Sequence, residues 1–540
     1  MLSLSLDPTV SHANPAFRNA AGCAQWLGQL QLTNLRLAHD TLRKQLDELN
    51  RCPLSGRERL GIMEQLRETV ADIQTDYAGK LSAKKLPLNT GEFSILVAIT
   101  GLWQSMGIGY QRCLQDYIDG EAQLADSAAL LCQRCLMYGG LQIMEHVHGC
   151  YEFDGKLWQR MHALYAYSED HGLHLQEIDC GLDGAPATQS CQAVYTGILL
   201  ACYAHRSGLS RAQMQILGHW LKRWSAAVNV ERQNIAGQDG AIALMVDLAS
   251  SQGLQSAAQD ATGNSLRYLP MAELSKMLRV KTILLQQGQS PQQLDLGTGC
   301  SRTECLALLN CLHQYWCEPP SERTARLQST DQFGQICYGM DGCFAYIANR
   351  PFKQPDKVTA VDTLSRKQIE TFGRVLTDTR HHDLTGLGFV CETWRIQNES
   401  LLGARLLREP GGTARIGHQQ LLALRPDDAD TFILGTVRWM NVTLSGQLRA
   451  GIRYLPGIAR AVAMKATGVN LTVSDQYVAA LLLPAVPELN TPASLIIPRN
   501  WFKPGLVVEI VEPEKNRLLA KMGISVDKGL DYERVSYSEI

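Results

Sequence analysis

The spacing of apolar residues changes once along this chain, close to residue 318. Before that point apolar residues recur at steps of three and four, the spacing that places side chains on one face of a helix. A representative stripe consists of Leu60, Met63, Leu66, Val70 and Ile73. After that point, short runs of β-branched and aromatic residues are separated by Gly, Pro and Asn. Because Pro319-Pro320 would stop a helix, the sequence predicts an α+β protein with a helical domain over residues 1–317 and a β-rich region after it.

The first domain is predicted to be all-helical. Ser55 and Glu58 have the spacing of a capping box at the start of a helix over residues 57–77. Further helices are expected over residues 91–117, 126–146, 155–169, 188–206, 210–229, 240–251, 271–287 and 302–317. No fixed period relates these segments, so a regular repeat architecture is not expected.

The β-rich region opens with a segment, residues 325–371, for which the sequence predicts a β-hairpin and a connecting helix. Gln335–Ala348 is interrupted by Gly339–Gly342, which is typical of a hairpin turn. Ser365–Arg374 is predicted to be a short helix with Ser365 as its N-cap. Residues 469–540 are expected to hold additional strands, as a barrel extension or as a second small barrel. These strands are predicted over Tyr477–Leu483, Ser494–Ile497, Leu506–Val511, Arg517–Met522 and Glu533–Tyr537.

Composition limits the class of protein. The chain has 540 residues, a hydrophobic content of 45% and a net charge of −2, with no basic stripe that would indicate a general nucleic-acid binder. Met1–Pro8 lacks the basic and apolar parts of a signal peptide. Ile95–Trp103, the most apolar stretch, is too short to cross a bilayer. We therefore expect a cytoplasmic protein without membrane insertion.

Sixteen cysteines are spread along the chain, and their densest group raises the question of a metal site. Cys132 and Cys135 form a C-x-x-C pair, and His146, His148 and Cys150 follow. This set of side chains could bind zinc in principle. The alternative is that the two cysteines belong to an apolar helix face, since a second C-x-x-C pair is missing. We favour the second interpretation and predict no metal and no other cofactor.

The common catalytic motifs are absent from the sequence. It contains no glycine-rich dinucleotide or phosphate loop, no G-x-S-x-G and no H-E-x-x-H. His381-His382-Asp383 could suggest a metal or phosphohydrolase pair, but a polar loop before a strand is the preferred interpretation. No convergent acid and base can be named, so no catalytic residues and no enzymatic activity are predicted.

One hexapeptide carries the functional information. Asn398–Gly403 has the pattern N-x-S-x-x-G and follows a strand-like run over residues 390–396. Three further strand-like runs come after it, over residues 420–424, 432–439 and 448–455. This order resembles the PilZ family of small six-stranded β-barrels that bind cyclic di-GMP. The resemblance covers residues 372–468.

The resemblance implies a ligand site. In PilZ proteins the Asn, Ser and Gly of the motif serve ligand binding, and they match Asn398, Ser400 and Gly403. Arginine suits the ligand because its planar fork matches phosphate oxygens and guanine O6 and N7, and its face stacks on a purine. Ligand-binding PilZ domains also carry R-x-x-x-R earlier in the chain. The corresponding window contains Arg374 and Arg380, which are six positions apart and not four.

This departure leaves more than one function open. The first hypothesis is a bacterial cyclic di-GMP effector that regulates motility, pili, attachment or secretion, with the helical domain binding a protein partner. The alternatives are a ligand-independent PilZ-like scaffold and an enzyme regulated by the barrel. Two further expectations follow. In the run over residues 432–439, side chains of a strand alternate between its two faces, which places Val437 and Trp439 inside the barrel. Residues 354–380 are expected to couple the barrel to the helical domain.

Overall fold

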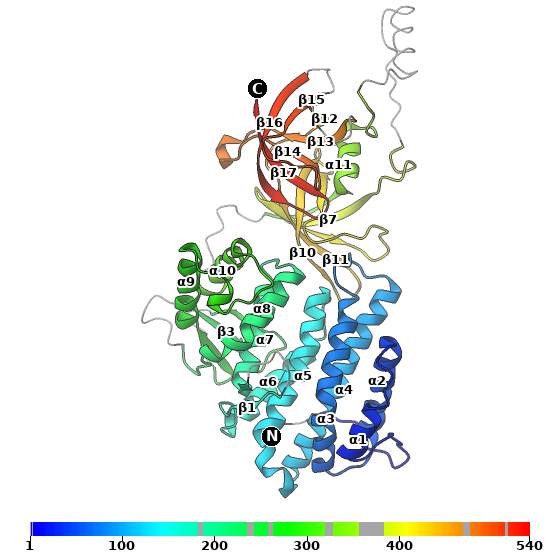
Figure 1. Ribbon diagram of the computed structural model, residues 1–540, viewed down its shortest axis with the longest axis vertical. Coiled ribbons are helices and arrows are strands. Elements are labelled where there is room, and N and C mark those ends of the chain that lie inside the picture. The colour runs from blue at the N-terminus through cyan, green and yellow to red at the C-terminus, as the bar shows by residue number, and fades with distance from the viewer. Residues whose placement is uncertain are drawn as a thin grey trace, which may run out of the picture. The chain divides into compact units, whose positions relative to one another are not determined.

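The computed structural model describes residues 2, 4–181, 187–234, 242–257, 263–318, 328–355, 383–467, 476–512 and 517–540. The chain forms two units. The first unit comprises Met1–Lys84 and Leu88–Arg323, and the second comprises Lys85–Pro87 and Thr324–Ile540. The first is mainly helical and the second mainly β (Figure 1). This confirms the α+β class and the change of character near residue 318.

The helical unit is built on the apolar stripes seen in the sequence. Met63, Leu66, Val70 and Ile73 are all buried in one continuous core. The helices are α1 (Ala20–Leu27), α2 (Leu35–Arg51), α3 (Gly56–Gly79), α4 (Thr90–Ile118), α5 (Ala128–Gly149), α6 (Lys156–Asp170), α7 (Cys191–His205), α8 (Arg211–Trp224), α9 (Ala272–Gln286) and α10 (Arg302–Cys317). Ser55 is the N-cap of α3, where it accepts a hydrogen bond from the Glu58 N–H at 3.3 Å.

Helix α4 is long and apolar enough that length and composition alone would fit a membrane span. In its most apolar 18-residue window, 56% of the residues are buried inside the protein. The helix packs against α2, α3 and α5, and it starts with a full capping box between Asn89 and Glu92. These contacts are those of a central helix in a packed bundle.

The helical unit also contains small sheets, so the expectation of an all-helical domain was wrong. Within the expected helix 240–251 lies strand β3 (Ala243–Asp247), which pairs with β4 (Gln255–Ser256) and β5 (Leu266–Pro270). A second, two-stranded sheet joins β1 (Ile178–Asp179) and β2 (Thr188–Gln189). A short apolar run such as residues 243–246 fits either structure, and pairing with the distant β5 decides between them.

The second unit contains two closed six-stranded barrels. The strands of the first are β6 (Gln328–Tyr338), β7 (Cys391–Ser400), β8 (Gly403–Arg408), β9 (Leu421–Pro426), β10 (Ile433–Val442) and β11 (Leu448–Tyr454), in the order β10-β11-β8-β7-β6-β9. The strands of the second are β12 (Arg460–Ala466), β13 (Val478–Leu483), β14 (Ser494–Pro498), β15 (Val507–Val511), β16 (Arg517–Lys528) and β17 (Tyr532–Glu539), in the order β12-β13-β14-β17-β16-β15. Helix α11 (Gly339–Ala348) packs against strands of both barrels.

The expected hairpin over residues 335–348 is wrong, because only its first half is a strand. Strand β6 ends at Tyr338, and Gly339 has a φ of +76° where α11 begins. Met340, Cys343 and Phe344 are then buried at helical spacing in the core that the two barrels share. The strands also group differently from the expected bounds 372–468: the first barrel begins with β6, and β12 belongs to the second barrel. The predicted helix at Ser365–Arg374 lies outside the described residues.

The division into units predicts the behaviour of a fragment. Residues 325–540 alone should be soluble and give a β-dominated circular dichroism spectrum, because both barrels close within that range. The fragment lacks Lys85–Pro87, which belongs to the same unit, so it should unfold at a lower temperature than the barrels of the full chain. A strongly helical spectrum would contradict the assignment.

Candidate functional site

The hexapeptide forms the β7–β8 hairpin of the first barrel. Leu401 and Leu402 occupy its turn and are 79% and 56% exposed. The Ser400 hydroxyl closes the turn, since it accepts a hydrogen bond from the Leu402 N–H at 3.3 Å and donates one to the Gly403 carbonyl at 3.2 Å. A Cβ at Gly403 would overlap the carbonyl of Ile452 on β11. Ser400 and Gly403 therefore shape the hairpin itself.

A lateral row of residues crosses four strands beside this hairpin. Asn398 on β7 pairs with Arg405 on β8, Arg405 pairs with Gly451 on β11, and Gly451 pairs with Trp439 on β10. The neighbours of Arg405 and Gly451 along their strands, Ala404, Leu406, Ala450 and Ile452, are buried. Because side chains alternate between the faces of a sheet, this row lies on the outside of the barrel.

The position of Trp439 corrects a prediction from the sequence. Val437 is buried inside the barrel as expected, but the β10–β11 register shifts between Val437 and Trp439. This bulge adds one residue, Arg438, and so places Trp439 on the outer face with Arg405 and Gly451. Trp439 is half-buried there.

Gly451, Trp439 and Arg405 form a layered platform. A Cβ at residue 451 would overlap the Trp439 indole, so the ring lies directly against the glycine backbone. The Arg405 guanidinium lies 5.7 Å from the centre of the indole ring, within cation–π range. The Arg405 Nε is buried and has no hydrogen-bond partner in the part of the chain that the structure describes. An aromatic ring and a guanidinium placed in this way suit a flat base.

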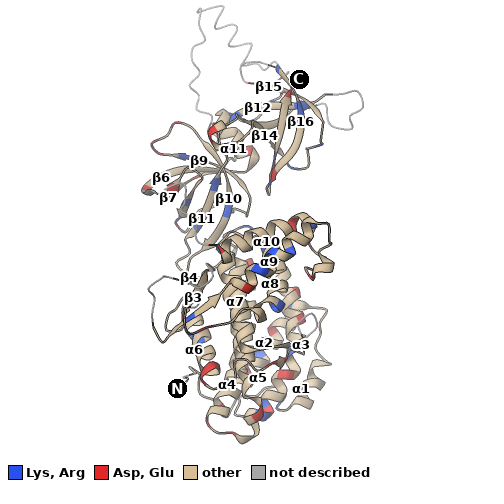
Figure 2. Ribbon diagram, turned by 90° about the vertical axis from the view of Figure 1, so that its left-hand side faces the viewer, with Lys and Arg blue, Asp and Glu red and all other residues tan. Residues whose placement is uncertain are grey.

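The three strands that carry Arg405, Trp439 and Gly451 are rich in arginine. Strands β8, β10 and β11 carry five arginines and no acidic residue: Arg405, Arg408, Arg438, Arg449 and Arg453. Blue segments on β10 and β11 in Figure 2 mark basic residues on these strands. Arg408 points into the barrel and is paired with Glu392, and Arg453 is paired with Asp527 at 3.0 Å. Arg449 is opposite Leu407 and so lies on the same outer face as Arg405. This surface favours an anionic ligand.

The structure brings together some of the sequence-predicted site residues and leaves others undescribed. Asn398, Ser400 and Gly403 lie together at the hairpin, whereas Arg374 and Arg380 lie outside the described residues, as does most of the segment 354–380. Sequence reasoning missed Arg405, Trp439 and Arg449. A usable signal was Gly451 in the last strand of the barrel, because a glycine inside a strand marks close approach of another group.

The cysteine and histidine group is part of a helix. Cys132 and Cys135 are buried on α5, His146 and His148 lie near its end, and Cys150 is its C-cap residue with a φ of +55°. Burial raises the pKa of the Cys132 thiol to about 12, which disfavours the thiolate that zinc requires. Among the described residues, no three or more potential metal ligands come together. His381 and His382 fall in an undescribed segment, and Asp383 accepts a hydrogen bond from the Gly386 N–H at 2.9 Å in a turn.

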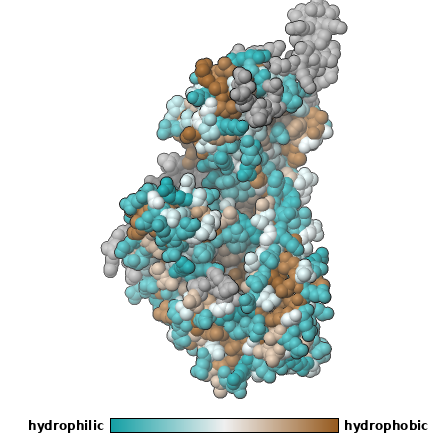
Figure 3. Space-filling model, viewed as in Figure 1, coloured by the Kyte–Doolittle hydropathy of each residue, from teal (hydrophilic) through white to brown (hydrophobic). Residues whose placement is uncertain are grey.

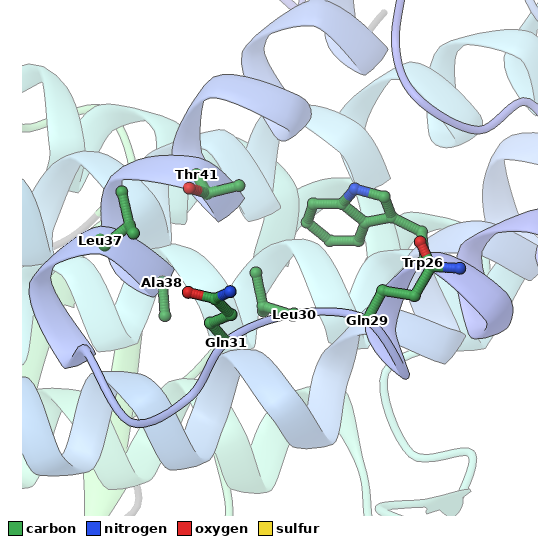
Figure 4. Close-up of a pocket in the computed structure, with 7 residues that line it drawn as sticks. All are labelled: Trp26, Gln29, Leu30, Gln31, Leu37, Ala38 and Thr41. Carbon is green, nitrogen blue, oxygen red and sulfur yellow. The ribbon is translucent and has the colours of Figure 1, made fainter.

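The helical unit has a surface hollow of about 300 Å³ between the end of α1 and the start of α2. Figure 4 shows Trp26 and Leu37 at its two ends, with Leu30 and Gln31 between them. Its lining contains no charged side chain. The hollow therefore lacks the groups that an anionic nucleotide would need.

Comparison with known proteins finds similarity to a cyclic-di-GMP receptor. Residues 20–234 match the family model described as the N-terminal domain of the cyclic-di-GMP receptor FimW, and residues 463–540 match the FimW C-terminal beta-barrel domain. The first barrel lies between these two matches. The cyclic-di-GMP receptor FimW of Pseudomonas aeruginosa is 22% identical over 548 aligned residues, which cover 93% of this chain and 88% of that protein. The chain is therefore similar, at both ends and along most of its length, to cyclic-di-GMP receptors of the FimW type.

Proposed function

We propose that this protein is a bacterial cyclic di-GMP receptor that binds the dinucleotide on the outer face of its first barrel. The observation that carries the proposal is the row Asn398, Arg405, Gly451 and Trp439 beside the β7–β8 hairpin. The similarity to a protein named as a cyclic-di-GMP receptor supports it. As a receptor for an intracellular nucleotide, the protein would act in the cytoplasm.

Each residue of the face has a role that its chemistry supports. Arg405 and Trp439 stack on a guanine face, and the Asn398 amide hydrogen-bonds to a guanine edge. Arg449 neutralises a phosphate, together with Arg374 and Arg380 from the preceding segment. Ser400 and Gly403 keep the hairpin in the shape that presents Asn398. No step of this proposal requires a metal or a catalytic group.

The helical unit is proposed as the output part, which binds a protein partner. In the view of Figure 3, hydrophobic surface gathers over the helices that are blue in Figure 1. Exposed apolar residues of this unit include Leu32, Leu37, Phe93 and Val97. By its similarity to FimW and by the PilZ resemblance, we propose that the regulated process is motility, pilus function, attachment or secretion.

Replacing Arg405 tests where the ligand binds. Loss of a charge-assisted interaction is worth about 1.5–3 kcal/mol, so Arg405→Ala should weaken cyclic di-GMP binding by about 10- to 150-fold. The control is Arg460→Ala, since Arg460 is an exposed residue of the second barrel and forms an ion pair with Glu512 at 3.3 Å. Calorimetry on the full chain measures both. Equal affinity of the two variants would place the site elsewhere, and absence of binding in the wild type would favour the ligand-independent scaffold.

A further inference from the structure

Three residues between α3 and α4 belong to the barrel unit and not to the helices that flank them. We call this segment, Lys85–Pro87, the strap. The Leu86 N–H donates to the Ile416 carbonyl at 2.8 Å, and the Ile416 N–H donates to the Leu86 carbonyl at 2.8 Å. Leu86 is 4% exposed and Ile416 is 1% exposed. The strap is thus paired with the loop between β8 and β9 as a short antiparallel bridge.

Arg415 fixes the strap from both sides of Leu86. Its Nη2 donates to the Lys85 carbonyl at 2.7 Å, and its Nε donates to the Pro87 carbonyl at 3.0 Å. One guanidinium therefore satisfies the carbonyls on either side of the bridge. Because hydrogen bonds to charged donors are stronger than neutral ones, Arg415 contributes to holding the strap in place beside the backbone bridge.

The loop that holds the strap is bonded to the strand that carries Trp439. The Gln419 N–H donates to the Val437 carbonyl at 2.8 Å, and the Val437 N–H donates to the Gln420 carbonyl at 3.1 Å. The Gly417 N–H donates to the Gln420 side-chain oxygen at 2.8 Å. The β10 bulge follows directly after Val437. Continuous hydrogen bonds therefore join the strap to the part of β10 that places Trp439 on the platform.

The other end of the strap leads into α4. The Leu88 N–H donates to the Tyr151 hydroxyl at 3.0 Å, and the capping box of Asn89 and Glu92 starts the helix. Lys84, just before the strap, forms an ion pair with Glu92 at 3.6 Å. The strap is therefore continuous in sequence with the first turn of α4, the central helix of the helical unit.

We propose that the strap is the element through which cyclic di-GMP bound to the first barrel controls the helical unit. The proposal rests on the proposed function. A ligand held by Trp439 and Arg405 stabilises the β10 bulge, which stabilises the loop 415–420 and keeps the strap paired. A ligand shifts an equilibrium between two forms only if it binds one of them more tightly. The proposal therefore requires that the form in which the strap has separated from Ile416 binds cyclic di-GMP less tightly than the paired form. The strap is a different coupling element from residues 354–380, which the sequence analysis expected to connect the barrel to the helical domain.

Hydrogen exchange on the full chain tests the proposal at one amide. The Leu86 N–H should exchange more slowly when cyclic di-GMP saturates the protein, by a factor of about 5–150, the usual range of allosteric coupling. Arg415→Ala should speed exchange of the same amide without ligand. By reciprocity it should also weaken cyclic di-GMP binding, although Arg415 is not part of the platform. Arg460→Ala should change neither quantity.

The outcomes separate this proposal from the proposed function. If calorimetry shows cyclic di-GMP binding and Leu86 exchange does not change, the strap proposal is overturned and the receptor function stands. Arg415→Ala could instead speed exchange of the Leu86 amide and still bind cyclic di-GMP as tightly as the wild type. Arg415 would then hold the strap without any link between strap pairing and ligand binding, which also overturns the proposal. If the wild type does not bind cyclic di-GMP, both proposals fall.

Discussion

Arg408→Ala is expected to destabilise the first barrel by about 3–5 kcal/mol, the usual cost of breaking a buried ion pair from one side. Arg408 is 5% exposed, and its Nη1 donates to the Glu392 carboxylate and to the Ala414 carbonyl, both at 2.7 Å. Its guanidinium also lies 5.3 Å from the ring centre of the buried Trp394. The substitution leaves a mostly buried carboxylate without its cation.

Thermal or urea unfolding of the full chain, followed by tryptophan fluorescence and by the loss of β signal, measures this effect. Arg460→Ala is the matched control, since its exposed pair with Glu512 should contribute no more than about 1 kcal/mol. Equal stability of the two variants would show that the Glu392–Arg408 pair does not hold the barrel together.

The Glu392–Arg408 pair also makes the stability of the first barrel depend on pH. Burial would raise the pKa of Glu392, but the Ala414 N–H and the Arg408 guanidinium outweigh burial and hold the pKa below its ordinary value. A carboxylate with a lowered pKa stabilises the fold above its unfolded pKa, and this stability is lost as pH falls through the folded pKa. The wild-type barrel should therefore lose stability in acid, and Arg408→Ala should lose less over the same pH range.

Gly451→Ala is expected to remove most ligand binding while the barrel still closes. The added methyl would overlap the Trp439 indole, so the ring must leave its place against β11 and its contact with Arg405. Stacking of a base on an aromatic side chain is worth about 1–3 kcal/mol. Cyclic di-GMP should therefore bind about 5- to 150-fold more weakly.

A second glycine provides the control for this substitution. Gly342 lies on α11 in the same unit, and a Cβ there meets no atom within 4 Å. Gly342→Ala should leave affinity unchanged, with the circular dichroism spectrum confirming that both variants are folded. If Gly451→Ala binds as tightly as Gly342→Ala, the platform is not part of the site.

The sequence predicted those parts of the fold that depend on local periodicity. The stripe through Met63 and Val70 gave α3 nearly to its ends, and the runs at 477–483 and 494–497 coincide with β13 and β14. Predictions failed where a short apolar run fits both periods. Residues 243–246 form such a run, and residues 340–345 are a short, partly apolar segment of the same ambiguity; distant partners decide their structure: β5 for the first and the shared core of the barrels for the second.

The candidate site was predictable only in part, for a similar reason. Asn398, Ser400 and Gly403 form a local motif that can be recognised in the sequence. Trp439 was assigned to the wrong face because one inserted residue in β10 reverses the alternation after Val437. The strap could not be predicted at all, since Leu86 and Ile416 are far apart in the sequence and no local pattern relates them.

A calorimetric titration of the wild-type full chain with cyclic di-GMP at physiological salt tests the central claim most directly. We predict heat that saturates below about 100 µM ligand and weak competition by GTP, which lacks the second guanine and the cyclic backbone. No heat at that concentration, with the protein folded, would contradict the claim that the outer face of the first barrel is a cyclic di-GMP site.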